Sequence, residues 1–337
     1  MRIAVDAMGG DFGPDVTVPA CVSLLEENHD VSLVLTGDQS VLIPMMAQYS
    51  SELCQRIKIH HTSEVVEMDE SPSSALRNKK DSSLRVALNL LLAGDVDACV
   101  SAGNTGALMA TAKFVLKMIP GISRPAILTR MPTESGAITR VLDLGANVDS
   151  SAEQLVQFAI MGSILAEAVG GVERPRVGLL NIGEEDVKGS QQIRQAAELL
   201  QQIKSLNYIG FVEGNDWFSG RADVVACDGL VGNIALKAVE GVSSLIANYL
   251  VGSFKRNIFS QLSGILAKPT LSNFKNKIDS RNFNGATLVG VNGVVIKSHG
   301  SADEYAFKNA LCEAMLEVEK NVPALIAQKL GELIPLT

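Results

Sequence analysis

Glycine-bearing turns with polar side chains recur along this sequence, each of them after an expected strand. The turns that lead into an expected helix are Ser101–Gly106, Asn181–Gly189, Cys227–Asn233 and Lys297–Ser301, and Asp6–Asp11 follows a strand in the same way. A helix N-terminus offers unpaired backbone N–H groups and a positive dipole end, and glycine lets a ligand approach the backbone. One such turn needs glycine for its geometry alone, but several together, rich in Asn, Ser, Thr and Asp, predict binding of an anion such as phosphate.

A few side chains in these turns are candidates for direct chemistry. Lys188 is either a solvated lysine among acidic neighbours or a point charge on a phosphate. Asn233 either caps its helix or donates its amide to a phosphate or carbonyl oxygen. His299 lies in a glycine-flanked turn, which suits a general acid or a phosphate ligand. Asp6 and Asp228 either orient these groups or cap turns.

Several other kinds of site are not encoded. The sequence contains no GxxxxGK[ST], no GxGxxG after the first strand, no GxSxG, no HExxH and no paired Cys/His spacing. We therefore expect no nucleotide motif, no hydrolase serine, no metal site and no cofactor. The five cysteines are scattered, which is typical of thiols in a reducing cytosol. Cys227 ends an apolar strand without a neighbouring base and is interpreted as a buried thiol rather than a nucleophile.

Composition limits the classes of partner. The 337 residues carry a net charge of −8, with one Trp and four Tyr, which disfavours nucleic-acid binding because that depends on basic patches and aromatic platforms. Hydrophobic residues make up 47% and charged residues 20%, as in ordinary globular proteins. The start of the chain does not resemble a signal peptide, and no run approaches eighteen uninterrupted apolar residues. We expect a cytoplasmic protein without a membrane-spanning helix.

Short β-branched runs alternate with amphipathic stretches along most of the chain, which is typical of βαβ units. Strands are predicted at 3–6, 32–36, 57–60, 97–101, 126–130, 139–144, 176–181, 208–211, 223–227 and 294–297. Helices are predicted at 15–27, 84–92, 105–117, 152–168, 190–203, 233–250 and 302–319. We therefore expect one three-layer α/β/α domain over residues 1–337, with a mainly parallel sheet whose strand ends carry the polar turns along one shared edge.

The stretch 251–285 interrupts this alternation and is predicted to be a helical, amphipathic insertion. On one helical wheel its apolar face spans roughly 140° and is made of Phe254, Ile258, Phe259, Leu262, Ile265 and Leu266. Basic residues, including Lys255, Arg256 and Lys268, outnumber acidic ones, and Pro269 is expected to separate a second segment. This insertion either packs on the core or on a second subunit, lies on anionic lipid, or docks an acidic partner protein.

Taken together, the motifs resemble the phosphate acyltransferase family of bacterial phospholipid synthesis, over essentially the full length. The residues that carry the resemblance are Asp6–Asp11, Ser101–Leu108, Asn181–Glu185 with Lys188 and Gly189, Glu213–Asp216, Cys227–Asn233 and Asn292–Gly300. Leu230 departs from the family pattern, where an aromatic residue is expected. The resemblance implies a homodimeric α/β/α fold akin to phosphotransacetylases and to isocitrate and isopropylmalate dehydrogenases.

The implied reaction transfers an acyl group from acyl carrier protein to inorganic phosphate and yields acyl phosphate, an early step of glycerophospholipid synthesis. A membrane-embedded glycerol-3-phosphate acyltransferase would use the product, so peripheral association with the membrane is expected. A phosphotransacetylase-like enzyme that uses acyl-CoA is the alternative. A metal- and NAD-dependent dehydrogenase of the same architecture would need clustered aspartates, which the sequence does not show. A non-catalytic membrane scaffold would not need five polar glycine turns.

The resemblance also suggests roles for particular residues. Lys188, Asn233, His299 and Asp228 are the expected catalytic residues, with Asn233 on the carbonyl or the phosphate and His299 on the phosphate or the departing thiolate. Phosphate itself is expected to be held by Gly103, Asn104, Thr105, Gly106 and Gly232, and the supporting loop comprises Asp6, Gly9, Gly10 and Asp11. The amphipathic residues Phe254–Lys268 would contact the membrane or the carrier protein.

Overall fold

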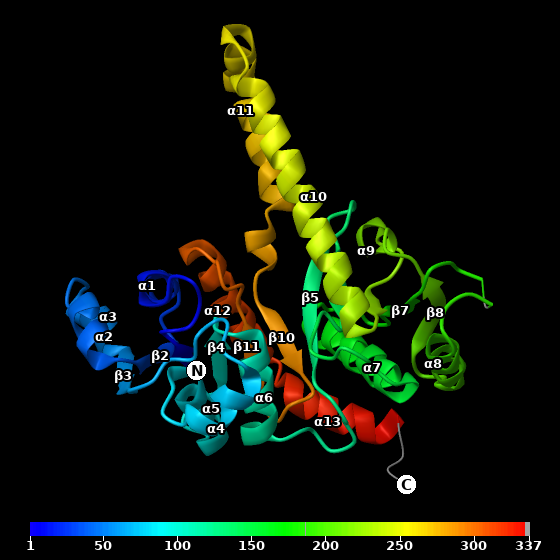
Figure 1. The fold of residues 1–337 in the computed structure, drawn as a ribbon, viewed down its shortest axis with the longest axis horizontal. Helices are drawn as coiled ribbons and strands as arrows, with labels where there is room; N and C mark the ends of the chain where they lie inside the picture. Colours follow the sequence, from blue (N-terminus) through cyan, green and yellow to red (C-terminus); the bar gives the residue numbers. More distant parts are fainter. Residues whose placement is uncertain (186, 334–337) are drawn as a thin grey trace.

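The strands form a single 11-stranded sheet in the computed structural model, which describes residues 1–185 and 187–333 (Figure 1). The strand order is β3-β2-β1-β4-β11-β10-β5-β6-β9-β7-β8. The strands are β1 (Arg2–Asp6), β2 (Ser32–Gly37), β3 (Ile57–His61), β4 (Ala98–Ser101), β5 (Ala126–Pro132), β6 (Ile138–Leu142), β7 (Arg176–Leu180), β8 (Asn207–Val212), β9 (Val224–Ala226), β10 (Ala286–Val289) and β11 (Val294–Lys297).

The helices cover both faces of this sheet. They are α1 (Pro14–Glu27), α2 (Gln39–Met46), α3 (Ser51–Gln55), α4 (Pro72–Asn78), α5 (Ser83–Ala93), α6 (Thr105–Leu116), α7 (Ala152–Ala168), α8 (Gln191–Gln202), α9 (Asp216–Ser219), α10 (Gly229–Lys255), α11 (Ile258–Ile278), the 3-10 helix η1 (Ser280–Phe283), α12 (Glu304–Glu319) and α13 (Val322–Leu333). The predicted strands and helices all occur. The short elements α2, α3, α4 and α9 were not predicted, nor were β10 and α13.

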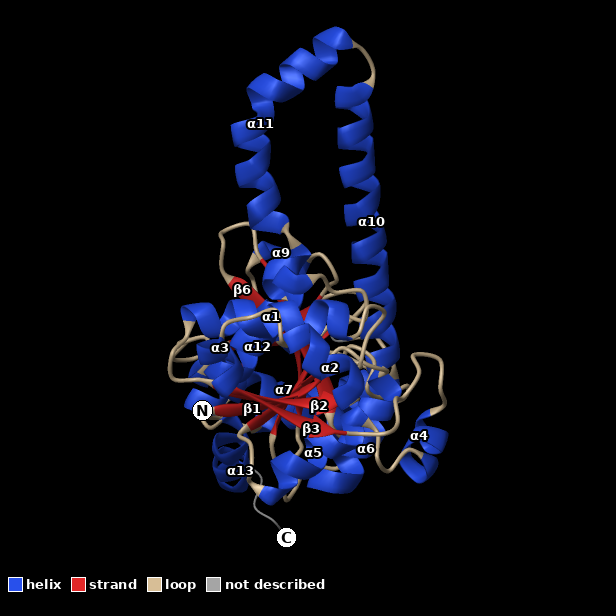
Figure 2. Ribbon diagram, turned by 90° about the vertical axis from the view of Figure 1, so that its left-hand side faces the viewer, coloured by secondary structure: helices blue, strands red, loops and turns tan. Residues whose placement is uncertain are grey.

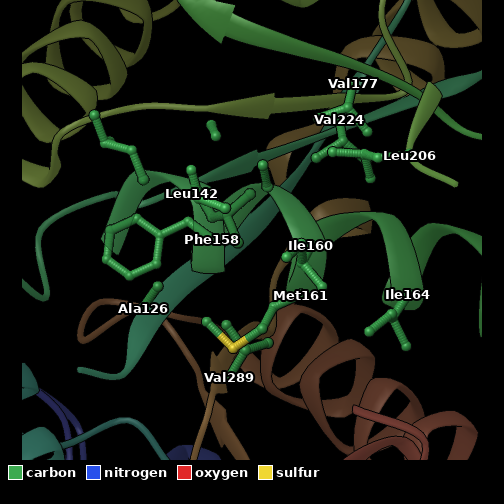
Figure 3. Packing of buried hydrophobic residues seen from close by; sticks show 14 of the residues in the cluster. Ala126, Leu142, Phe158, Ile160, Met161, Ile164, Val177, Leu206, Val224 and Val289 are labelled. Atoms are coloured by element: carbon green, nitrogen blue, oxygen red, sulfur yellow. The ribbon is translucent and has the colours of Figure 1, made fainter. Parts of the chain in front are cut away.

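The alternation of side chains along β1 explains the three layers. Ile3 and Val5 are fully buried against α1 and α12, whereas Ala4, between them in sequence, is buried with residues of α5 and α6. In the other half of the molecule α7 is buried along much of its length. Figure 3 shows Phe158 and Met161 of α7 packed among Leu142 of β6 and other apolar residues of the sheet. The α/β/α class predicted from the sequence is therefore confirmed.

The direction of the strands changes in the middle of the sheet. β3, β2, β1, β4 and β11 pair in parallel, as do β6, β9, β7 and β8. The pairs β11–β10, β10–β5 and β5–β6 are antiparallel, so the two parallel blocks run in opposite directions. The sheet is mainly parallel, as predicted. The expectation that all polar turns follow strands of one direction, and so share one edge, is wrong.

Two long helices, α10 and α11, form a hairpin that projects from the sheet (Figures 1 and 2). Its first arm already begins at Gly229, well before the predicted insertion. The expected single amphipathic helix is interrupted at Arg256 and Asn257, where the chain reverses, and Asn257 caps α11 by accepting from the backbone N–H of Ser260 at 2.9 Å. Pro269 does not end α11 but lies inside it.

The apolar side chains near the tip of the hairpin do not pack on the core, although Ala235 and Leu236 at the start of α10 do. Phe259 is 77% exposed and Leu266 is 84% exposed, and Ile258, Leu262 and Ile265 are also exposed. Packing on the core, one of the predicted alternatives, is therefore excluded for these side chains. Within the described residues, α10 is long and apolar enough to cross a membrane by length and composition, which the sequence analysis did not predict, and only 6% of its most apolar stretch is buried.

Candidate active site

The first cluster of the site lies where β1 and β4 end side by side. Asp6 is buried and accepts a hydrogen bond from the Ser101 hydroxyl at 2.7 Å, and the Gly103 N–H donates to the same hydroxyl at 3.0 Å. A Cβ on Gly9 would lie 2.5 Å from a carboxylate oxygen of Asp6 and 2.8 Å from the Gly103 nitrogen. Glycine is therefore required for the two turns to touch, and the predicted supporting loop does lie against the predicted phosphate loop.

Lys297, at the end of β11, adds a cation to this cluster. Its ammonium donates to the carbonyl oxygens of Ala102, at 3.1 Å, and of Ser298. Burial lowers the pKa of Lys297 to about 8, and the nearby carboxylates of Asp6 and Asp11 oppose this effect. Burial likewise raises the pKa of Asp6. A partly desolvated ammonium of this kind attracts an anion more strongly than a hydrated surface lysine does.

The next turn holds His299 in a defined orientation. The Ser301 N–H donates to His299 Nδ1 at 3.2 Å, and the Ser301 hydroxyl lies 2.9 Å from the same nitrogen. Because a backbone N–H only donates, Nδ1 accepts, and the neutral ring carries its proton on Nε2. Burial lowers the pKa of His299 and keeps the ring neutral near pH 7. The neutral Nε2–H is a hydrogen-bond donor for an oxygen of the substrate.

Asn104 has a structural role in the phosphate loop. Its side-chain oxygen caps α6 by accepting from the Ala107 N–H at 3.0 Å. Its amide nitrogen donates to the carbonyl oxygens of Glu67, Met68 and Glu70, at 2.8 to 3.2 Å. Every polar group of this side chain is thus committed to the protein. In this structure the Asn104 side chain positions the loop, and its amide is not directed at the predicted phosphate site.

The second cluster lies at the beginning of α10, after β9. Asp228 caps α10 by accepting from the Leu230 N–H at 3.0 Å, and it also accepts from the Ser150 N–H at 2.9 Å. Its carboxylate is thereby used for capping, the second of its two predicted roles. A Cβ on Gly232 would lie 2.1 Å from the Asp143 carbonyl oxygen and 2.8 Å from the Cys227 sulfur. Gly232 therefore permits close packing of α10 against the loop after β6.

Asp143 organises that loop, a role that was not predicted from the sequence. Its buried carboxylate accepts from the backbone N–H groups of Ile127, Gly145, Ala146 and Asn147, at 2.7 to 3.2 Å. Gly145, whose φ is +119°, then approaches Asn233 so closely that a Cβ would lie 3.3 Å from the amide carbon of that side chain. Asn233 is exposed and lies beside this loop, and Asp228 rather than Asn233 caps the helix.

The face of α10 that carries Asn233 connects the two clusters. Lys237 and Glu240 follow Asn233 at spacings of four and seven residues, so all three lie on one side of the helix. Lys237 and Glu240 form an ion pair at 2.8 Å. The charges of both residues affect the pKa of His299, and Lys237 also lowers the pKa of Lys297. The charges on this face of α10 therefore act on the first cluster, and neither charged residue was predicted from the sequence.

Lys188 lies in the turn after β7. Its side chain is 47% exposed and forms an ion pair with Glu185 at 3.7 Å, the solvated arrangement that was one of the two interpretations. Asn181 anchors the turn by donating to the Lys188 carbonyl oxygen at 3.2 Å. β7 pairs with β9, so this turn and the beginning of α10 lie at neighbouring strand ends. The predicted contact of Lys188 with phosphate stays a prediction.

The structure thus assembles the candidate residues in two groups. Asp6, Gly9, Gly10, Asp11, Gly103 and His299 belong to the first, since the Asp11 N–H also donates to the Gly300 carbonyl oxygen at 2.9 Å. Asp228, Gly232 and Asn233 belong to the second. Thr105 and Gly106 begin α6, where the first N–H groups have no intrahelical acceptor. Among residues 1–185 and 187–333 no group of three His, Cys, Asp or Glu side chains could hold a metal ion.

Comparison with known proteins identifies relatives along nearly the full chain. A family model described as "Fatty acid synthesis protein" matches residues 1–325. The chain is 53% identical over 334 residues to a phosphate acyltransferase of Alkalilimnicola ehrlichii, an alignment that covers 99% of this chain and 97% of the relative. It is 54% identical over 330 residues to a phosphate acyltransferase of Methylococcus capsulatus, covering 98% and 97%.

Solved structures show the same fold at low sequence identity. A phosphotransacetylase from Streptococcus pyogenes superposes with a TM-score of 0.65 at 17% identity, covering 95% of this chain and 94% of that chain. A 4-hydroxythreonine-4-phosphate dehydrogenase from Klebsiella pneumoniae gives 0.51 at 15% identity, covering 94% and 98%. The expected similarity to phosphotransacetylases and to dehydrogenase-like folds is confirmed. At these identities the likeness concerns the fold alone.

Proposed function

The chain belongs to the phosphate acyltransferase family of lipid synthesis, and we propose that its acyl donor is acyl-[acyl carrier protein]. Acyl phosphate would be the product, for use by a membrane-embedded glycerol-3-phosphate acyltransferase. The observation that carries this proposal is the group of turns that holds Lys297, His299 and the start of α6. These turns offer a buried cation, a neutral donor and a helix N-terminus, as transfer to a phosphate requires.

In the proposed mechanism the enzyme binds and orients its substrates. A phosphate oxygen attacks the thioester carbonyl carbon, a C–O bond forms, and the C–S bond then breaks to release the carrier thiolate, which takes a proton from phosphate or water. The ammonium of Lys297 and the N–H groups of Thr105 and Gly106 would hold phosphate. His299 Nε2–H or the Asn233 amide would donate to the oxygen that becomes negative in the tetrahedral intermediate.

Lys188 is the remaining cation proposed for this step. Its flexible side chain would leave Glu185 and bind a phosphate oxygen once the acidic carrier protein and phosphate are present. Asp228 would act indirectly, because it fixes the first turn of α10 and with it Asn233. Gly232 allows α10 to approach the sheet closely and so has the same indirect effect.

Apolar side chains around the second cluster support an acyl substrate. Leu230, Val231 and Ile234 on the first turns of α10 are each about half exposed or more, and Ile182 after β7 is 80% exposed. These strand ends are neighbours, because β9 pairs with β7. Exposed apolar surface beside a polar site would be covered by a fatty acyl chain.

The hairpin tip supports the remaining parts of the proposal. Lys255 and Arg256 are exposed where α10 ends, and Phe259 is exposed where α11 begins. Basic and apolar side chains together suit an anionic membrane surface, and the basic ones also suit the acidic surface of a carrier protein. We propose a cytoplasmic homodimer that associates with the membrane peripherally through this tip, with Phe254, Ile258, Leu262, Ile265, Leu266 and Lys268 as further contacts.

The donor is tested by supplying the purified protein with acyl-[acyl carrier protein] and phosphate and trapping acyl phosphate with hydroxylamine. We expect a hydroxamate with the carrier substrate and little with acyl-CoA, and the reverse outcome would replace the donor in our proposal. Lys188→Ala and Asn233→Ala are each expected to reduce turnover sharply without unfolding the protein. Near-normal activity in both variants would refute the roles given to these residues.

Membrane association is tested by flotation with vesicles that contain anionic lipid. A variant with Phe259, Leu262 and Ile265 all replaced by Ser should remain with the unbound protein, while its activity on the soluble carrier substrate persists. A variant with Lys255 and Arg256 replaced by Glu tests whether these basic side chains bind lipid or the carrier protein. Loss of carrier turnover without loss of flotation would assign the basic side chains to the carrier protein instead of lipid.

A further inference from the structure

Asn284, between η1 and β10, contacts the turn that carries His299. Its side-chain oxygen accepts from the His299 N–H at 3.0 Å. Its amide nitrogen donates to the Ser298 hydroxyl at 2.8 Å and to the Ala306 carbonyl oxygen at 2.7 Å. One side chain therefore joins the end of β11, the catalytic turn and the first turns of α12. The sequence analysis did not single it out.

We infer that Asn284 is a positioning residue that sets the orientation of His299, an inference that rests on the proposed function. An asparagine side chain offers one acceptor and two donors in a fixed plane, and here all three are used. The acceptor holds the backbone of His299, while the donors hold the residues on either side of the turn. A side chain without both kinds of group would leave a partner unsatisfied at the edge of the core.

Asn284 can hold the turn because its own backbone is fixed. The next residue, Gly285, has φ of +106°, and a Cβ there would lie 2.9 Å from the Cα of Ala310 in α12. Just before it, the carbonyl oxygen of Arg281 in η1 accepts from the Asn309 amide at 2.9 Å. Arg281 also forms ion pairs with Asp279 at 2.6 Å and with Asp303 at 2.8 Å. The segment that carries Asn284 is thus attached to α12 on both sides.

Loss of the Asn284 side chain should loosen His299 without removing the turn. The Ala302 N–H still donates to the His299 carbonyl oxygen at 3.1 Å, and the Asp11 N–H still donates to the Gly300 carbonyl oxygen at 2.9 Å. The remaining contacts therefore keep the chain path, while the backbone N–H of His299 loses its acceptor. The imidazole then gains water and several orientations, and its Nε2–H no longer points reliably at the substrate oxygen.

This position also makes the root of the hairpin a part of the site. α11 ends at Ile278, η1 follows directly, and Asn284 comes next, so the returning arm of the hairpin leads straight to the residue that holds His299. The outgoing arm begins with the face that carries Asn233. Both roots of the projecting hairpin thereby contribute to the orientation of groups around the phosphate.

The test compares Asn284→Ala with Asn292→Ala, which removes amide hydrogen bonds to the carbonyl oxygens of Leu116 and Met118 and has no contact with the His299 turn. We expect Asn284→Ala to lower kcat by roughly ten- to a hundredfold, the usual range for loss of alignment, with a smaller change in KM for phosphate. Asn292→Ala should stay within about threefold of wild type. In a His299→Ala background, Asn284→Ala should cause no further loss, because it acts through the imidazole.

A second readout does not depend on turnover. NMR follows the imidazole signals, and comparison with a His299→Ala spectrum assigns the signal of His299 among those of the four histidines. In wild type, burial holds the pKa of His299 below its usual value. The charges of Lys237 and Lys297 also lower this pKa, whereas those of Glu240 and Asp11 raise it. Asn284→Ala should raise the pKa of His299 towards 6.5, because the ring becomes better hydrated.

Three outcomes would overturn the inference: an unchanged His299 titration, an equal loss of kcat in the His299→Ala background, or an equal loss in Asn292→Ala. Should Asn284→Ala unfold, Asn284→Ser keeps a small hydrogen-bonding group and is measured in its place. An inactive wild type with the carrier substrate would refute the proposed donor, whereas the NMR titration would still decide the role of Asn284.

Discussion

Gly232 offers a direct test of how closely α10 must approach the sheet. In Gly232→Ala the new Cβ would lie 2.1 Å from the backbone oxygen of Asp143, about 1.3 Å closer than the 3.4 Å at which ordinary contact begins. It would also lie 2.8 Å from the Cys227 sulfur and 3.1 Å from a methyl group of Leu144. The nearest of these atoms belongs to the backbone and cannot rotate away, so the helix itself must move.

The size of the effect follows from two opposing terms. Alanine in a helix is favoured over glycine by about 1 kcal/mol, whereas overpacking a close contact costs roughly 1–3 kcal/mol or more. Because the new Cβ meets the Asp143 backbone and the Cys227 sulfur, we expect an overpacking cost at the upper end of this range. The net loss in the free energy of unfolding is then about 2 kcal/mol. Gly241→Ala, on the same helix, is the matched control because no atom lies within 4 Å of its Cβ, and it should stabilise by up to about 1 kcal/mol.

Urea denaturation measures both changes, and the hydroxylamine assay measures activity on the same preparations. Gly232→Ala should be both less stable and less active, because moving α10 carries Asn233 away from Gly145. Gly241→Ala should keep wild-type activity. A Gly232→Ala protein with wild-type stability and turnover would refute the view that α10 requires this close contact.

Two further predictions concern buried ionisable groups. Burial raises the pKa of Glu317 from 4.5 to about 8, so ionisation is disfavoured in the fold, and the free energy of unfolding should fall as pH rises through this interval. Glu317→Gln keeps an acceptor for the Thr287 hydroxyl and should remove this pH dependence. In urea titrations, the difference in the free energy of unfolding between pH 5 and pH 8 should shrink by up to a few kcal/mol, at about 1.4 kcal/mol per pKa unit. Burial lowers the pKa of Lys297 to about 8, so KM for phosphate should rise above that pH as the charge is lost. Lys297→Arg should retain its low KM at pH 9, since guanidinium stays charged.

The strands were predictable from the sequence, but their directions were not. β-branched runs identify β5 and β6, yet pairing direction depends on contacts between segments far apart and on the turns between them. The turn at 133–137 makes β5 and β6 a hairpin: the Thr133 N–H donates to the Ala137 carbonyl oxygen at 3.0 Å, and Gly136 has φ of +82°. The Thr-Glu-Ser-Gly stretch at this point was the available signal for reversal.

The turns of the site were predictable, whereas the role of each side chain was not. Glycine and polar residues after a strand indicate the anion-binding turns. Only the structure shows that the Asn104 amide donates to backbone carbonyl oxygens in the 67–70 segment. Lys297 is a lysine at the end of an otherwise apolar strand, next to Ser-His-Gly, which was a usable and neglected signal. Asn284 carried no local signal, because its partners come from β11 and α12.

The reversal of strand direction has a consequence for how the site is assembled. The ends of β4 and β11 cannot meet the ends of β6 and β9 at one edge of a flat sheet, because the two blocks run in opposite directions. Neighbouring strands twist by roughly 20–25°, so several intervening pairs rotate one block strongly relative to the other. The first turn of α10 packs on the Asp143 loop, and the charge of Lys237, further along the same helix, affects the pKa of His299 in the other block.

Because α10 belongs to both the site and the hairpin, the two cannot be independent. α10 has 27 residues and is about 40 Å long, at 1.5 Å per residue. When such a helix tilts, its tip moves far and its root moves a shorter distance in a direction set by the tilt. Gly232 fixes one root against the sheet, and Asn284 fixes the other against α12. If the tip binds lipid, a conformational effect on turnover would be transmitted through the roots of the hairpin, which include these two contacts. Loosening either root should therefore weaken the response of turnover to vesicles, while substitutions at the tip weaken binding itself.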